Sequence, residues 1–150
     1  MIENNQKIID LLDQMQAMRL DKSYLVCITF CYKIIPLLDS DNISSDYILD
    51  SVNKAKSFWF DKQSSITEDE IISRRVNIIK YMKEENISYD VNIKPELKFL
   101  ILPLWTRPPS DDIGDCLDWG LTLLKIINIS DSIIEAKLLE ALESVNQLKV

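Results

Sequence analysis

The sequence predicts an all-α fold, a single-domain bundle of six to seven helices with short connections over residues 1–150. Apolar residues recur with the 3.6-residue period of amphipathic helices along most of the chain. There are only two glycines, although about 7% is usual, and β-hairpins and barrels need residues that adopt positive φ. No repeat of fixed length is visible, which argues against a solenoid. A chain of this length buries a core of its own.

Two helices are expected in the N-terminal quarter. Residues 22–38 are almost entirely apolar, which predicts a central helix with Asp21 as its cap and with Pro36 kinking or ending it. Residues 3–18 form an amphipathic helix whose stripe is Ile8, Leu11, Leu12 and Met15.

The cysteines are expected to be reduced and buried. Cys27 and Cys31 lie four residues apart within the apolar 22–38 helix, and Cys116 is alone. A metal site needs more ligands than this pair supplies, so we interpret both as core residues.

The middle of the chain carries the clearest helix signals. Ser44 or Ser45 opens a helix that runs to about Phe60. Thr67 and Glu70 have the spacing of a capping box and begin a helix over 68–85. The buried stripe of that helix is expected to be Ile71, Ile72, Val76, Ile79 and Met82.

The C-terminal part is expected to contain three helices. Residues 86–94 alternate enough for a short extended segment, and Pro95 suits the first turn of a helix over 96–102. A proline-stiffened connection over 102–110 follows. Ser110 or Asp111 then caps a helix to about Asn128, and Ser130 caps a helix over 131–147. One face of that last helix carries Ile134, Leu138, Ala141, Leu142, Val145 and Leu148.

Composition argues against catalysis, cofactors and nucleic acid. There is no histidine, the commonest general base and a frequent metal ligand. The net charge of −7 lacks the basic footprint that nucleic-acid binding requires. No secretory signal is visible, and the longest apolar stretch, 99–105, is too short to span a membrane. We therefore expect a cytoplasmic protein that is no enzyme, holds no metal or cofactor and contacts no membrane.

One stretch of the sequence fits a catalytic signature. Residues 111–115, DDIGD, fit the DDxxD pattern of isoprenoid synthases, in which aspartates hold magnesium ions and a diphosphate. Those enzymes need a second acidic motif and basic diphosphate contacts. Acidic residues also gather at a helix N-terminus because the helix dipole favours them. A magnesium-dependent diphosphate enzyme is thus a remote alternative, and it predicts that Asp111→Ala or Asp115→Ala abolishes binding of Mg²⁺ and diphosphate.

Two acidic stretches, 39–53 and 108–124, contain no lysine or arginine. In the second, Asp111, Asp115 and Asp118 would share one helical face, where like charges repel. A basic protein partner would favour such a surface, whereas the alternative is an ordinary solvated face. The candidate partner-binding acids are Asp39, Asp41, Asp46, Asp50, Asp111, Asp112, Asp115 and Asp118.

Two tryptophans are candidate apolar anchors. Trp59 lies in the aromatic run 58–60, which either folds under a loop or leaves a ring exposed as an interface hot spot. Trp105 lies in the proline-stiffened connection, where rigidity limits the entropy lost on binding.

Residues 54–75, KAKSFWFDKQSSITEDEIISRR, resemble the helix, aromatic end, polar linker and arginine-bearing helix of some helical immunity proteins of bacterial polymorphic and contact-dependent toxin systems. The resemblance extends to the whole chain in size, charge and helical pattern. It implies a protein that neutralises a cognate toxin domain, often a basic nuclease, by occluding its active or substrate-binding site. A helical regulatory or adaptor protein that binds a peptide or helix is the alternative. A homodimer is compatible with each hypothesis.

Overall fold

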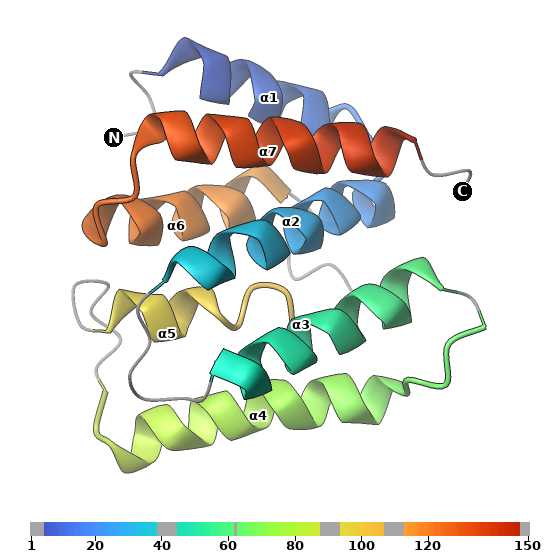
Figure 1. The fold of residues 1–150 in the computed structure, drawn as a ribbon, viewed down its shortest axis with the longest axis vertical. Coiled ribbons are helices and arrows are strands. Elements are labelled where there is room, and N and C mark those ends of the chain that lie inside the picture. The colour runs from blue at the N-terminus through green and yellow to red at the C-terminus, as the bar shows by residue number, and fades with distance from the viewer. Residues whose placement is uncertain (1–4, 39–44, 62, 88–93, 107–112, 148–150) are drawn as a thin grey trace.

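The computed structural model describes residues 5–38, 45–61, 63–87, 94–106 and 113–147. The described residues form seven α-helices and a short 3₁₀ helix with no strand, which confirms the all-α prediction (Figure 1). The helices are α1 (Gln6–Gln16), α2 (Leu20–Ile34), η2 (Ile35–Leu37), α3 (Ser45–Phe60), α4 (Glu68–Glu84), α5 (Pro95–Phe99), α6 (Ile113–Ile126) and α7 (Asp131–Asn146).

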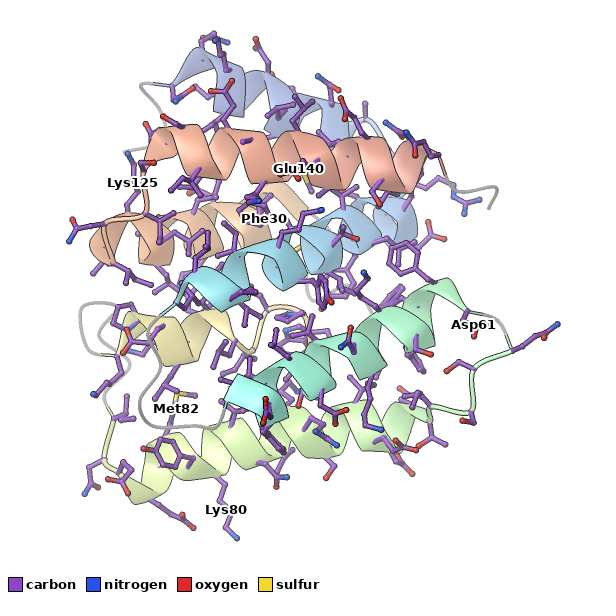
Figure 2. All side chains as sticks on the ribbon, viewed as in Figure 1. Phe30, Asp61, Lys80, Met82, Lys125 and Glu140 are labelled. Carbon is purple, nitrogen blue, oxygen red and sulfur yellow. The ribbon has the colours of Figure 1, made fainter. Side chains whose placement is uncertain are left out.

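Helix α2 occupies the centre of the bundle. It packs against α7, α3, α6 and α1, while α5 packs against α6 and α3 packs against α4. Helices α1 and α4 therefore lie at opposite ends of the molecule (Figure 1). Phe30 is fully buried and points from α2 toward α7 (Figure 2).

The prediction of a central, apolar second helix is confirmed. Cys27 and Cys31 are fully buried, as expected of core residues. Pro36 lies in η2, just after α2 ends at Ile34. The expected cap was wrong, because Arg19 is the N-cap and Asp21 lies in the first turn. There the Asp21 carboxylate accepts two hydrogen bonds from the Arg19 guanidinium, at 3.2 and 2.9 Å.

Two predicted caps are confirmed by hydrogen bonds. The Thr67 hydroxyl accepts from the backbone N–H of Glu70 at 3.2 Å, at the start of α4. The Ser130 hydroxyl accepts from the N–H of Ile133 at 3.4 Å, at the start of α7. The predicted buried face of α7 is confirmed for the residues that the structure describes, which do not include Leu148. Its buried residues are Ile134, Leu138, Ala141, Leu142 and Val145.

The predicted buried stripe of α4 was partly wrong. Ile71 is buried, but the second buried position is Ile78, and Val76 is 48% exposed. The reason is the place of α4 in the bundle. Because α4 lies at the edge and packs mainly against α3, the rest of the protein covers a narrow strip of its surface. Ile72 and Ile79 are half-buried beside that strip.

Pro95 begins α5 as expected, but the helix ends at Phe99 and not at residue 102. Residues 100–103 form turns instead. Pro103 disfavours helical backbone at the residue before it, which explains the early end. Most of the predicted extended segment 86–94 lies outside the described residues. No helix in the described part of the chain is both long and apolar enough to cross a membrane.

Candidate functional site

Few of the predicted acidic residues can be placed. Asp39, Asp41, Asp111 and Asp112 lie outside the described residues, and of Asp115 only the backbone in α6 is described. The remaining three side chains, Asp46, Asp50 and Asp118, are exposed.

A cation from another helix lies close to the stretch 39–53. The Arg74 guanidinium of α4 lies 2.9 Å from the Asp50 carboxylate and donates a hydrogen bond to the Ser51 hydroxyl at 3.1 Å. The same guanidinium lies 4.8 Å from the centre of the Tyr47 ring. The absence of a lysine or arginine within the stretch therefore does not leave the Asp50 charge uncompensated, because a neighbouring helix supplies the partner.

The described acids of the two stretches do not form one surface. Asp46 and Asp50 lie on α3, which packs against α2 and α4, whereas Asp118 lies on α6, which packs against α5, α1 and α2. The two helices lie on different sides of α2 (Figure 1). Asp118 is followed in α6 by Trp119, whose apolar side chain is exposed.

The structure brings the two predicted anchor tryptophans together. The Trp59 indole N–H donates to the backbone carbonyl of Trp105 at 2.9 Å, and the Trp59 ring packs edge-on against Tyr24 with centroids 5.0 Å apart. The buried Tyr24 hydroxyl donates to the Leu102 carbonyl at 2.6 Å and accepts from the Trp105 N–H at 3.1 Å. Trp59 and Tyr24 thus fix the backbone on either side of Leu104.

Side chains of helix α4 also hold the segment around Trp105 in place. The Arg75 guanidinium lies 4.1 Å from the centre of the Trp105 ring and donates to the Leu104 carbonyl at 3.0 Å. The Thr106 hydroxyl donates to the Glu68 carboxylate at 2.9 Å. The backbone N–H, carbonyl and ring of Trp105 are all used within the protein. Contact of Trp59 or Trp105 with a partner stays a prediction.

Sequence reasoning missed Trp119, whose side chain is 40% exposed on α6. It forms one wall of an apolar pocket of about 360 Å³ between the end of α4, α5 and α6. Met82 points from α4 toward α5 in this region (Figure 2). The pocket is lined by Ile79, Met82, Lys83, Ile87, Lys98, Ile101 and Trp119.

A signal for Trp119 was present in the sequence. Positions 115, 118, 119 and 122 lie on one helical face, so the tryptophan lies among polar residues on the solvent side of α6. Asp118 and Thr122 are exposed, while Leu117, Leu121 and Leu124 are buried on the inner side. A large aromatic residue on a solvated face is a common mark of a binding surface.

The chemistry available at this site is that of binding. Its side chains are apolar except for two lysines, of which Lys83 is exposed and Lys98 is only 6% exposed. Within the described ranges, no group of three or more Asp, Glu or Cys side chains could hold a metal ion. Of the DDIGD motif, Asp111 and Asp112 lie outside those ranges, and of residues 113–115 only the backbone is described.

Comparison with known proteins found no family model, no curated protein and no solved structure that matches this chain.

Proposed function

We propose that this protein is an immunity protein of the cytoplasm that binds and neutralises a cognate bacterial toxin domain by occluding its active or substrate-binding site. The observation that carries the proposal is the exposed pair of Asp118 and Trp119 on α6. It combines a negative charge with a large apolar side chain on one solvated helix.

Each member of the pair has a distinct physical role in such a complex. The exposed Asp118 carboxylate, in a protein of net charge −7, favours approach of a basic domain and speeds association. Trp119 supplies the apolar contact, because burial of its partly exposed ring in the complex makes the free energy of binding more favourable. Tryptophan is also enriched at interface hot spots. The lack of histidine and the resemblance of residues 54–75 to helical immunity proteins support a role in binding.

The test is capture of the partner in the native host at low and high salt. We expect the tagged protein to retain one basic domain at low salt and to lose it as salt rises. Asp118→Lys should slow association about tenfold or more at low salt, and Trp119→Ala should speed dissociation. The matched control is Asp13→Lys, which makes the same charge change at an exposed position on α1.

Two results would contradict the proposal. The first is capture that Asp118→Lys and Asp13→Lys reduce equally, because the charge of α6 would then have no special role. The second is capture of a partner that resists high salt and shows a large negative heat-capacity change on binding. That second result, with sensitivity to Trp119→Ala alone, would support the alternative of a regulatory or adaptor protein that binds a peptide or helix.

A further inference from the structure

We propose that the outer face of α4 is an interface between two copies of this chain, which pair their α4 helices antiparallel about a two-fold axis at Val76. The outer face of α4 consists of Asp69, Ile72, Val76, Ile79 and Lys83. The proposal is independent of the proposed immunity function, because that function depends on residues of α6.

The spacing of the outer face is that of two helices in contact. Its members follow one another at intervals of three, four, three and four residues, which is the spacing of the contact seam in paired helices. The three inner members are apolar. Val76 is the middle residue of α4, which runs from Glu68 to Glu84. A two-fold axis at Val76 would therefore let two copies overlap along the whole helix.

The apolar side chains of the outer face are available for such a contact. Val76 is 48% exposed, and Ile72 and Ile79 are half-buried. None of the three packs against the buried core that the structure describes, whereas Met82 of the same helix does. Lys80, which lies on the same side of the helix four residues after Val76, points away from the bundle (Figure 2). Covering this face would remove apolar surface from water.

The charges at the two ends of the outer face complement each other. Asp69 and Lys83 each lie seven residues from Val76, in opposite directions along the helix. In an antiparallel pair centred on Val76, Asp69 of each copy therefore lies opposite Lys83 of the other copy. This arrangement gives two pairs of opposite charge. A parallel pair would instead place Asp69 opposite Asp69.

Asp69 and Lys83 have no ion-pair partner among the described residues, and both are exposed. Charges on the side of α4 that faces α3 are used within the protein. Glu70 lies 3.8 Å from the Lys54 ammonium group, and Arg74 is paired with an aspartate of α3. The order of charges along the outer face selects a second copy as the occupant, because the surface at a two-fold axis must be complementary to itself.

The test is sedimentation equilibrium of the intact protein over a range of concentrations. We expect a reversible equilibrium between monomer and dimer with a Kd of roughly 1–100 μM, in keeping with a small interface. No larger species should form, because an interface with a two-fold axis closes at the dimer. Val76→Asp places two carboxylates at the axis and should raise Kd at least about tenfold. Circular dichroism should show that this variant keeps its helices.

The matched control is Leu139→Asp. Leu139 is 45% exposed on α7, so the change also replaces an exposed apolar side chain with a carboxylate. It should leave Kd unchanged, because α7 takes no part in the proposed interface.

Charge reversal tests the antiparallel arrangement. Asp69→Lys alone or Lys83→Asp alone should raise Kd about tenfold at low salt, because each places like charges opposite each other. The two changes together restore opposite charges and should return Kd to within about threefold of the wild-type value. Within one copy the two positions are about 21 Å apart along the helix, so this recovery reports a contact between copies.

Four results would overturn the proposal. The first two are a monomer at every concentration and growth beyond the dimer. The third is an equal rise in Kd for Val76→Asp and Leu139→Asp, and the fourth is a double reversal that binds no better than the single reversals. None of these outcomes depends on whether a toxin partner is found.

Discussion

Individual side chains explain why the segment after α5 is ordered. The prolines around Trp105 predicted a stiff connection, but its attachment depends on Tyr24, Trp59 and Arg75, which come from three different helices. No sequence pattern indicates which tyrosine hydroxyl meets which carbonyl, because these contacts join positions that are distant in the chain. The caps at Thr67 and Ser130 were predictable because both partners lie within three residues.

Removing the Tyr24 hydroxyl tests this attachment. Tyr24→Phe leaves the ring against Trp59 but removes two hydrogen bonds to the backbone of Leu102 and Trp105. We expect the free energy of unfolding to fall by about 1–3 kcal/mol in urea titration, the usual cost of leaving buried polar groups unpaired. Tyr81→Phe is the control, since the Tyr81 hydroxyl has no hydrogen bond to a described residue. Equal effects of the two substitutions would show that Tyr24 contributes by its ring alone.

The pH dependence of stability should reveal Asp131. A hydrogen bond from Lys125, aided by one from Asn5, lowers the pKa of the Asp131 carboxyl below its ordinary value of 3.8. Because the folded-state pKa is the lower one, the ionised carboxylate stabilises the fold above that ordinary value and loses this effect as the pH falls through the lowered pKa. Asp131→Asn should therefore lower Tm at pH 7 and have progressively less effect below pH 3.8.

The control for that experiment is Asp13→Asn, at an exposed aspartate on α1. A reduction in Tm by Asp131→Asn that is constant from pH 7 to pH 2 would contradict the account.

Helical periodicity predicted the existence and type of the elements but not the width of the face that each helix buries. On α2 nearly the whole surface is buried, and on α7 the predicted face is the buried one. On α4 the apolar residues are more numerous than its edge position can cover, so the pattern could not distinguish Ile78 from Val76. Which helix lies at the edge depends on the arrangement of all of them.

Paired truncations on α4 test that correction. Ile78→Ala should lower the free energy of unfolding by about 2–4 kcal/mol, because Ile78 is buried and its loss leaves a cavity. Val76→Ala should change it by less than about 0.5 kcal/mol, because Val76 is largely in water. Chemical denaturation of both variants measures the difference. If Val76→Ala lowered the free energy of unfolding more than Ile78→Ala, the buried stripe predicted from the sequence would be right instead.

The approach of α6 to α5 depends on Gly120. A Cβ atom at this position would lie 2.5 Å from Leu102 Cδ1 and 3.4 Å from Phe99 Cε2. Both neighbours are buried, so the overpacking cost of about 1–3 kcal/mol should exceed the gain of about 1 kcal/mol in helix propensity. Gly120→Ala should therefore destabilise the protein by about 1 kcal/mol in urea titration.

A double variant provides the control for Gly120. In Gly120→Ala with Leu102→Ala, the shortened leucine makes room for the new methyl group, so the combined effect should be smaller than the sum of the two. Strict additivity would show that the two positions do not contact each other.

At the scale of the whole molecule, the fold class was predictable and the proposed binding surface was only partly so. Charge and composition pointed to a binding protein, and Asp118 lies exposed on α6 as predicted. The structure adds Trp119, which is exposed, whereas the sequence predicted Trp59 and Trp105 as anchors. Charge along the sequence could not show that Arg74 of α4 would pair with Asp50 of α3, because that pairing depends on how the helices pack.

The most direct test of the central claim is protection of living cells. The basic domain captured with this protein should be produced in a bacterial host with the wild-type protein, with Trp119→Ala carrying Asp118→Lys, or with neither. We expect cells to survive with the wild-type protein and to die with the double variant or with neither. Equal survival in all three cultures, or death in all three, would contradict the claim that the surface around Trp119 neutralises a toxin.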